Sequence, residues 1–236
     1  MTTAGVWHPV ALSASIEPGS SAGTHIDGKE YVVWRDNSGA PHVWEDRCPH
    51  RGMKLSFGFV RGDHIACLYH GWQYDTAGQC RYIPAHPELD VPGSIRVPVF
   101  QTVEVAGMIW VATEPTESAP PAPQEAGETV PVRSVFFGAA VHAVLAAIET
   151  TPSRPFSDEA AASVLRQIDG RLYALTVGND RLLLGLHSLS GERTALHVVI
   201  AGPAARYAGK GQAHFLAWTA ELRHRIETHP AAEVAA

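Results

Sequence analysis

The sequence predicts a mainly β protein, α+β once its helical segments are counted, and two observations support this class. Short apolar and β-branched runs are followed closely by turn residues, as at residues 30–34 before Asn37, Ser38 and Gly39. Glycine and proline are frequent, with 21 and 17 among 236 residues, which is typical of many turns. Short strands at this spacing favour a sandwich or barrel over βαβ units.

The first third of the chain is predicted to consist of strands. Residues 30–44 are predicted to form a hairpin, because an extended pattern resumes at Pro41 after the turn residues. Residues 97–100 and 108–111 are further strand candidates, and Gly107 opens the second of them.

The composition changes between residues 114 and 131. This stretch holds five prolines and four glutamates and no basic residue. Because it has few apolar side chains to bury and its prolines favour extended backbone, we expect a domain linker at residues 115–131. A long surface loop inside one domain is the alternative.

The remainder predicts a mixture of helices and strands. Residues 139–148 are alanine-rich and fit a helix, and residues 171–177 and 181–186 fit a hairpin around Gly178, Asn179 and Asp180. Residues 195–200 would form the next strand. Residues 214–226 fit an amphipathic helix, because apolar residues recur every three or four positions. The predicted buried stripe of this helix consists of Phe215, Trp218, Leu222 and Ile226.

Composition and charge exclude several classes of function. Lys plus Arg number 18 against 24 Asp plus Glu, a net charge of −6, so nothing indicates nucleic-acid binding. Three cysteines are too few for a disulfide framework. No apolar run approaches the roughly 20 residues of a membrane span, and the first residues show no signal peptide. We therefore expect a cytoplasmic protein that binds neither nucleic acid nor membrane.

Two short motifs carry the chemistry. Cys48 and His50 form a Cys-x-His pair, and Cys67 and His70 form a Cys-x-x-His pair. Two thiolates and two imidazoles suit Zn²⁺ or an iron–sulfur centre. In a Rieske [2Fe-2S] centre, two Cys hold one iron and two His hold the other. The alternative is a Cys₂His₂ zinc site without electron chemistry, which would be colourless.

The residues beside these pairs fit loops that grip a cluster. Gly52 and Gly71 follow the histidines, where a tight turn would let backbone N–H groups approach the sulfides. Pro49 would stiffen the first loop, and Trp72 would cover the cluster and lower the local dielectric.

On these motifs, residues 7–114 resemble the N-terminal domain of the Rieske-type non-haem iron oxygenases, which include aromatic-ring hydroxylases and O-demethylases. Arg51-Gly52, Leu55-Ser56, Gly58 and the run CLYHGWQYD are also similar to that family. So are AGQC, IPAHP and the MIWV strand. The resemblance implies a Rieske [2Fe-2S] cluster held by Cys48, His50, Cys67 and His70.

Departures from respiratory-chain Rieske proteins refine this expectation. Those proteins carry two further cysteines that join the cluster loops, at positions that here hold Met53 and Tyr69. Trp72 also stands where they have a serine, so one hydrogen bond that raises the potential is missing. The resemblance thus implies a potential near the low end of the roughly −150 to +300 mV range of Rieske centres. Cys80 lies outside both pairs and is interpreted as an ordinary buried thiol.

In the oxygenases, the second domain has a helix-grip fold that holds mononuclear Fe(II) with two His and one carboxylate. The best match to their Asp-x-x-His-x-x-x-x-His signature places Thr150, Ser153 and Asp158 at the three ligand positions. Hydroxyls are poor Fe(II) ligands, so we expect no mononuclear iron here. The pairs His142 with Glu149 and His187 with His197 are interpreted as scattered histidines without a metal role.

The sequence therefore predicts a Rieske β-sandwich domain at residues 5–114, a linker at 115–131 and a shortened helix-grip α+β domain at 132–236. The expected function is single-electron transfer from a flavin or ferredoxin reductase to a catalytic partner, either an oxygenase subunit or another copy of the chain. One alternative is a small Rieske monooxygenase or O-/N-demethylase with an atypical mononuclear iron site. Another is a non-catalytic binding or regulatory subunit that keeps a cluster for stability.

Overall fold

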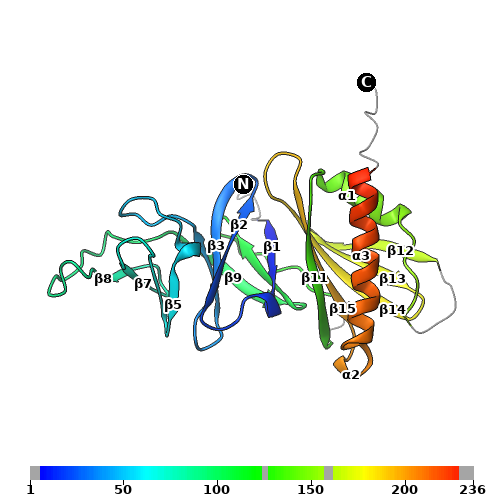
Figure 1. Ribbon diagram of the computed structural model, residues 1–236, viewed down its shortest axis with the longest axis horizontal. Coiled ribbons are helices and arrows are strands. Elements are labelled where there is room, and N and C mark those ends of the chain that lie inside the picture. Colours follow the sequence, from blue (N-terminus) through cyan, green and yellow to red (C-terminus); the bar gives the residue numbers. More distant parts are fainter. Residues whose placement is uncertain (1–5, 124–126, 157–161, 229–236) are drawn as a thin grey trace.

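The computed structural model describes residues 6–123, 127–156 and 162–228, which form two lobes (Figure 1). The strands of the N-terminal lobe are β1 (Trp7–Leu12), β2 (Ser20–Ile26), β3 (Lys29–Arg35), β4 (Pro41–Glu45), β5 (Phe59–Arg61), β6 (His64–Ala66), β7 (Gln73–Asp75), β8 (Cys80–Tyr82), β9 (Val99–Val105) and β10 (Met108–Ala112). Short 3₁₀ turns η1 (Ser13–Ser15) and η2 (Leu55–Phe57) interrupt them.

These strands form two antiparallel sheets. The larger has the order β1-β10-β9-β4-β3-β2, and the smaller has the order β5-β6-β7-β8. The predicted hairpin is confirmed as β3 and β4, in which Val33 pairs with Val43. The predicted strands 97–100 and 108–111 correspond to β9, which begins two residues later, and to β10. A mainly β fold is therefore present.

The C-terminal lobe is a five-stranded antiparallel sheet with helices on one face. Its elements are β11 (Thr129–Phe137), α1 (Val141–Thr150), β12 (Ser163–Asp169), β13 (Leu172–Val177), β14 (Asp180–Ser188), β15 (Thr194–Ala201), α2 (Ala204–Tyr207) and α3 (Lys210–Thr228). The sheet order is β11-β15-β14-β13-β12. The predicted helices, the hairpin of β13 and β14, and the strand β15 are confirmed within a few residues.

The linker prediction is wrong at its C-terminal end. Thr129, Val130 and Pro131 belong to β11, not to the connection between the lobes. Pro131 is tolerated because β11 is an edge strand and its register shifts between Pro131 and Arg133. The described residues between β10 and β11 form no helix or strand.

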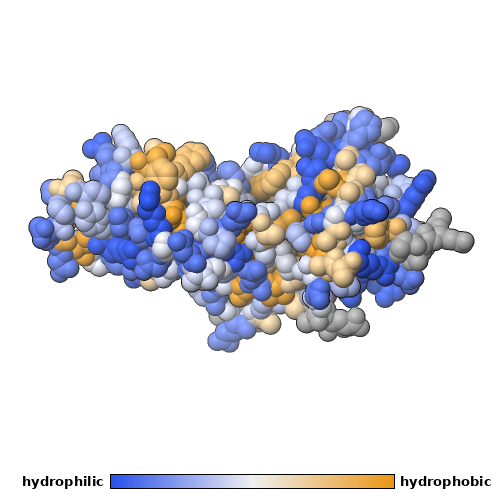
Figure 2. All heavy atoms as spheres, turned by 60° about the horizontal axis from the view of Figure 1, so that its bottom comes forward, coloured by the Kyte–Doolittle hydropathy of each residue, from blue (hydrophilic) through white to orange (hydrophobic). Residues whose placement is uncertain are grey.

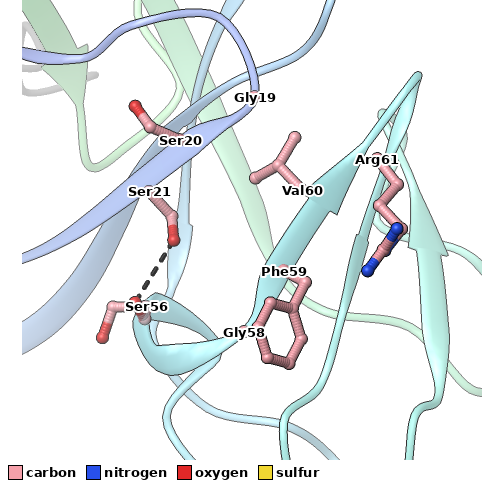
Figure 3. Close-up of a pocket in the computed structure, with 8 residues that line it drawn as sticks. All are labelled: Gly19, Ser20, Ser21, Ser56, Gly58, Phe59, Val60 and Arg61. Atoms are coloured by element: carbon pink, nitrogen blue, oxygen red, sulfur yellow. Dashed lines mark hydrogen bonds between the residues drawn. The ribbon is translucent and has the colours of Figure 1, made fainter.

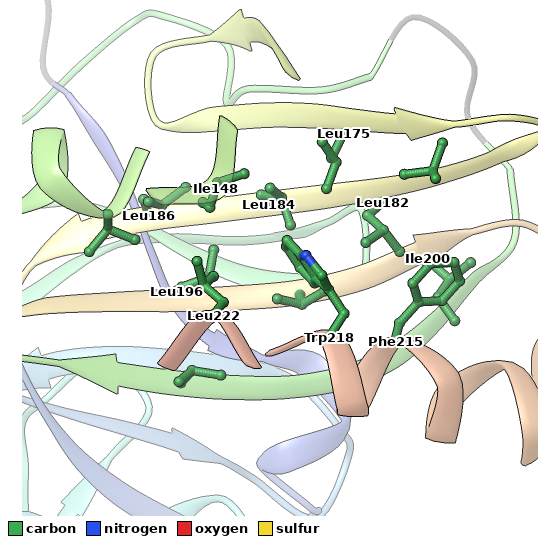
Figure 4. Close-up of a cluster of buried hydrophobic side chains, with 14 of the residues drawn as sticks. Ile148, Leu175, Leu182, Leu184, Leu186, Leu196, Ile200, Phe215, Trp218 and Leu222 are labelled. Atoms are coloured by element: carbon green, nitrogen blue, oxygen red, sulfur yellow. The ribbon is translucent and has the colours of Figure 1, made fainter. Parts of the chain in front are cut away.

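The face of the C-terminal sheet beneath α3 carries the core of this lobe (Figure 4). Phe215, Trp218 and Leu222 project from α3 toward the leucines of β14 and β15, as the helical periodicity predicted. Ile226 is only partly buried at the end of the same stripe.

The opposite face of this sheet packs on the N-terminal lobe. Leu183 and Val199 lie in one hydrophobic cluster with Trp7, Met108 and Trp110 of the first lobe. Two backbone hydrogen bonds also join the lobes, from Asp27 N to the Ser188 carbonyl at 3.2 Å and from Gly28 N to the Leu189 carbonyl. The two lobes are therefore fixed against each other by a continuous core.

The surface is mixed, with polar side chains over much of the face in Figure 2 and separate hydrophobic patches on both lobes. Within the described residues, no helix has the length and apolar character needed to cross a membrane.

Candidate metal centre

The two predicted ligand loops follow strands and share one backbone design. The Cys48 loop follows β4, and the Cys67 loop follows β6. In the first, Gly52 N donates to the Cys48 carbonyl and Cys48 N donates to the Met53 carbonyl, both at 2.8 Å. In the second, Gly71 N and the Trp72 carbonyl make the equivalent bonds with Cys67, both at 2.9 Å. The loops are therefore matched supports for one sulfur each.

Glycine is required where each loop turns back. Gly52 has φ 72° and Gly71 has φ 69°, a left-handed conformation that other residues rarely adopt. The sequence predicted that tight turns at these glycines let backbone N–H groups approach the sulfur, and the glycine N–H groups close those turns. The N–H groups of His50 and Arg51 face the Cys48 sulfur, and those of Tyr69 and His70 face the Cys67 sulfur.

The structure brings the two predicted thiols together inside the lobe and the two predicted imidazoles together nearer its surface. Cys48 and Cys67 are buried, at 2% and 3% exposure, and their side chains interact with each other. The rings of His50 and His70 lie edge to face with centroids 4.7 Å apart. His70 is exposed and His50 is half-buried. Buried sulfur and surface nitrogen are thus presented as two pairs.

The groups around Cys48 favour the thiolate form of its side chain. The hydrogen bond with Cys67 lowers the pKa of Cys48 to about 6, and the backbone N–H groups act in the same direction. The same interaction and burial raise the pKa of Cys67, so the two thiols share one proton in the absence of iron. Because metal ligation needs thiolates, iron would displace that remaining proton.

A buried tyrosine contacts the first sulfur. The hydroxyl of Tyr74, on β7, lies 3.1 Å from the Cys48 sulfur. Burial raises the pKa of Tyr74, and its interaction with Cys48 raises it further, so the hydroxyl keeps its proton and donates once Cys48 is a thiolate. Cys80 is also buried, and its thiol faces the Tyr82 carbonyl at 3.8 Å.

Aromatic rings orient the imidazoles. Trp72 is stacked on His50, with centroids 4.3 Å apart and planes 4° apart. Tyr69 lies against His70 at 3.9 Å between centroids. The ring of Trp72 thus holds a predicted ligand in place, a role that its position after Gly71 alone did not indicate.

The donor chemistry fits an iron–sulfur centre. Two sulfurs approach from inside the lobe and two ring nitrogens from its surface, which matches a cluster held by Cys₂ on one iron and His₂ on the other. Backbone N–H groups and the Tyr74 hydroxyl supply hydrogen bonds to the sulfurs, which tune cluster potentials.

Two of the positions matched to a mononuclear iron site carry hydroxyl side chains in unlike environments. Thr150, the last residue of α1, is exposed, and its hydroxyl donates to the Ala146 carbonyl at 3.0 Å. Ser153 is buried, and its hydroxyl has no hydrogen-bond partner within the part of the chain that the structure describes. Asp158 lies outside the described residues. Among the described residues, no group of three or more His, Cys, Asp or Glu side chains is placed to hold a single metal ion.

The remaining histidine pairs separate into two kinds. His142 and Glu149 are exposed on α1. His187 and His197 are core histidines on the adjacent strands β14 and β15, with rings stacked 5.6 Å apart. His187 Nε2 lies 3.1 Å from the His25 carbonyl of the first lobe. This pair is therefore part of the joint between the lobes.

A hollow of about 320 Å³ lies between β2 and β5 (Figure 3). It is lined by Gly19, Ser20, Ser21, Ser56, Gly58, Phe59, Val60 and Arg61. Ser21 donates its hydroxyl to the Ser56 carbonyl, and Ser20 donates to the Glu17 carbonyl. None of the four predicted ligands lines this hollow, so it is separate from the candidate metal centre.

Comparison with protein families gives the class of the N-terminal lobe. Residues 6–101 match the Rieske [2Fe-2S] domain. Solved structures with the same fold include apo dicamba monooxygenase, with a TM-score of 0.74 and 17% identity over 98% of this chain and 89% of that one. Another is NdmA of Pseudomonas putida CBB5, with a TM-score of 0.72 and 21% identity over 98% and 84%.

Curated proteins with similar sequences include oxidoreductases and demethylases. Oxidoreductase NdmD of Pseudomonas putida is 38% identical over 105 residues, 44% of this chain and 18% of that protein. Methylxanthine N1-demethylase NdmA of the same species is 37% identical over 119 residues, 44% and 31% respectively. The chain thus spans less than a third of the length of these curated relatives.

Residues 6–101 are therefore a Rieske [2Fe-2S] domain related to those of the Rieske non-haem iron oxygenases, and the chain as a whole has the fold of these oxygenases.

Proposed function

We propose that this protein is a Rieske-type electron carrier, in which Cys48, His50, Cys67 and His70 hold the [2Fe-2S] cluster. A bound cluster supplies one-electron chemistry. Cys48 and Cys67 fix it from the buried side, while His50 and His70 bring its outer iron to the surface. The exposed imidazoles give a partner direct access to the redox centre.

The observation that carries this proposal is the contrast between the two sets of ligand positions. The thiols and imidazoles of the first lobe are assembled, whereas Thr150 and Ser153 offer neutral hydroxyls in different environments, one exposed and one buried. Neutral hydroxyls bind Fe(II) poorly compared with imidazole. The second lobe then serves as a structural partner for the first, through the shared core around Trp110 and Leu183.

The electron would come from a flavin or ferredoxin reductase and pass to a catalytic oxygenase subunit or a second copy of the chain, in the cytoplasm. The division of labour follows the proposed domains, Rieske at residues 5–114 and helix-grip at 132–236. The lobe boundary lies between β10, which ends at Ala112, and β11, which begins at Thr129.

An anaerobic titration followed by exposure to O₂ tests the proposal. We expect the visible spectrum to change on uptake of about one electron per chain. Reoxidation in the presence of caffeine or dicamba, the compounds named with the solved relatives, should yield no demethylated product. Uncatalysed reoxidation with both compounds unchanged supports an electron carrier, and formation of product by the isolated chain contradicts it.

A small monooxygenase or demethylase is the second candidate, because the fold similarity extends over 89% of the dicamba monooxygenase chain. This candidate requires an atypical mononuclear site in the second lobe. It predicts that added Fe(II) binds to the as-isolated protein and that product then appears in the same assay.

A further inference from the structure

The proposed cluster would come closest to the protein surface at the edge that holds the two imidazoles. Both cysteine sulfurs are buried, and the N-terminal lobe closes over them with Leu55, Ile65 and Tyr74. His50 and His70 are the two predicted ligands that reach the surface. A protein that exchanges electrons with this centre would therefore come closest to it at the edge formed by the two imidazoles.

Two apolar side chains stand exposed at this edge. Leu68 and Tyr69 lie between Cys67 and His70 and are 49% and 53% exposed. The Tyr69 ring contacts the His70 ring, so it borders the point of electron entry. Exposed aromatic side chains beside a functional group are typical of protein contact sites, because they bury a large area at small entropic cost.

Two cations frame the same edge. Arg47 and Arg51 lie on either side of Cys48 and His50, and both are exposed. The guanidinium of Arg47 folds over the ligand loop, with Nε 3.5 Å from the position that a Cβ would take at Gly52. The Arg47 guanidinium therefore lies at the rim of the candidate centre, and Arg51 is the exposed residue that follows His50 in the same loop.

Three cations of the lobe are paired with carboxylates, whereas Lys29, Arg61 and Arg96, like the two arginines at this edge, form no ion pair within the described residues. Arg35 pairs with Glu104 at 2.8 Å, Lys54 with Glu30 at 2.6 Å, and Arg81 with Asp63 at 2.9 Å. Within the part of the chain that the structure describes, Arg47 and Arg51 have no carboxylate partner.

The closest carboxylate in sequence is already engaged. Asp46, next to Arg47, is buried and accepts hydrogen bonds from the Ser56 backbone N–H at 2.7 Å and from the Ser56 hydroxyl at 2.6 Å. The two arginines are thus free to meet carboxylates from outside, in a chain whose net charge of −6 would otherwise repel an acidic protein.

We propose that the electron donor is a protein with carboxylates around its redox centre, and that it docks on the cluster rim, defined as Arg47, Arg51, Leu68 and Tyr69. This inference rests on the proposed function and adds the charge of the partner. The arginines attract and orient the donor, and the two apolar side chains bring its redox centre against His50 and His70. One electron leaves the donor and reduces the oxidised cluster.

The test uses a photoreduced plant-type [2Fe-2S] ferredoxin as an acidic probe, which at about −400 mV lies below the Rieske range. Stopped-flow absorbance gives the rate constant, and titration calorimetry gives the dissociation constant. We compare the parent protein with Arg47→Glu, Arg51→Glu and the double variant. Arg61→Glu is the matched control, because Arg61 is exposed and lies at the opposite end of the β5–β6 hairpin from Cys67. Free reduced FMN serves as a small donor that needs no docking.

We expect the double variant to react roughly tenfold more slowly with ferredoxin at low salt and to bind it more weakly. Raising the salt concentration should slow the parent and remove most of this difference. Arg61→Glu should match the parent, and all variants should keep the parent's visible spectrum and its rate with FMN.

Equal ferredoxin rates for the double variant and the parent would overturn the docking proposal while leaving electron transfer intact. A change in sedimentation of the double variant without a change in rate would also overturn it, because the rim would then bind a second copy of the chain. Failure of both ferredoxin and FMN to reduce the parent would instead overturn the proposed function.

Discussion

The two lobes use similar antiparallel sheets but place their reactive side chains differently. In the N-terminal lobe, thiols and imidazoles gather on two loops at the end of short hairpins, half inside and half at the surface. In the C-terminal lobe, the helix-covered face of the sheet is filled by Phe215, Trp218 and Leu222. The first lobe therefore carries its donors at the margin of a hydrophobic cluster, whereas the second fills the corresponding space beneath α3 with apolar side chains.

Under the proposed function, the fold of the second lobe would persist without the ligands of a mononuclear iron. The C-terminal sheet keeps the architecture of oxygenase relatives over nearly the whole chain. What holds a metal is the donor set, not the sheet that presents it. The account predicts that changes in one lobe alter iron binding and that changes in the other alter mainly stability.

The largest effect should come from the predicted ligands. Replacing Cys48 with Ser or His70 with Ala should remove or bleach the cluster, because each change removes one of its four proposed donors. Visible absorbance and iron content of the purified variants measure this. Cys80→Ser is the control and should remain coloured, and equal bleaching of Cys80→Ser and Cys48→Ser would show that the ligand assignment is wrong.

The core of the second lobe should respond differently. Phe215→Ala removes a fully buried ring and should lower the free energy of unfolding by about 3–5 kcal/mol, with the cluster spectrum retained. Urea unfolding monitored by circular dichroism measures this. Its neighbour Leu216 is 40% exposed, and Leu216→Ala should cost less than about 1 kcal/mol. Loss of the cluster in Phe215→Ala at neutral pH would contradict the division between lobes.

The joint between the lobes should weaken in acid. Burial lowers the pKa of His8 and of His197 to about 4, and it holds the pKa of His187 well below its usual value. Arg171 lowers the pKa of His8 and His187, and Asp27 partly opposes this at His8. Below pH 6.5 the unfolded chain binds protons that the folded chain does not, so stability falls as the pH drops from 6.5 toward 4.

A histidine variant isolates this effect. His197→Gln should lose about 2 kcal/mol less stability than the parent between pH 6.5 and pH 5, since one proton-binding group of the unfolded chain is gone. Urea unfolding at both pH values measures the difference. His142→Gln, exposed on α1, is the control and should follow the parent. Parallel pH dependence of His197→Gln and the parent would refute the role of the buried pair.

The smallest expected effect is a change in the reduction potential of the proposed cluster. Tyr74→Phe removes a hydrogen bond to the Cys48 sulfur that stabilises the more negative, reduced state. We expect the reduction potential to fall by about 40 mV, equivalent to roughly 1 kcal/mol. Tyr31→Phe, buried in a different cluster of the same lobe, should leave the potential unchanged. A rise in the potential of Tyr74→Phe would contradict the proposed donor direction.

The sequence predicted the elements that have strong local patterns. The β3–β4 hairpin and α3 follow from continuous apolar runs or a helical stripe. The strands β5 to β8 were missed because each has only three residues, and β2 was missed because its Ser and Gly residues are half-exposed. Such strands are defined by long-range pairing, which no local window contains.

Contacts between residues far apart in the sequence also limited what could be predicted about the candidate metal centre. The four predicted ligands were found because their spacing is itself the signal. The contact of Tyr74 with Cys48 spans 26 residues, and the stack of His187 on His197 depends on the register of β14 and β15. Only the alternation of burial along β7, with Tyr74 buried between two half-exposed residues, could have indicated an inward hydroxyl.

The iron content of the purified chain, measured with its acid-labile sulfide after incubation with excess Fe(II) and gel filtration, tests the central claim most directly. The account predicts about two irons and two sulfides per chain, all lost together in His70→Ala. A third iron that remains bound to the parent chain and survives in His70→Ala would show a mononuclear site in the second lobe, and the proposal of an electron carrier would be contradicted.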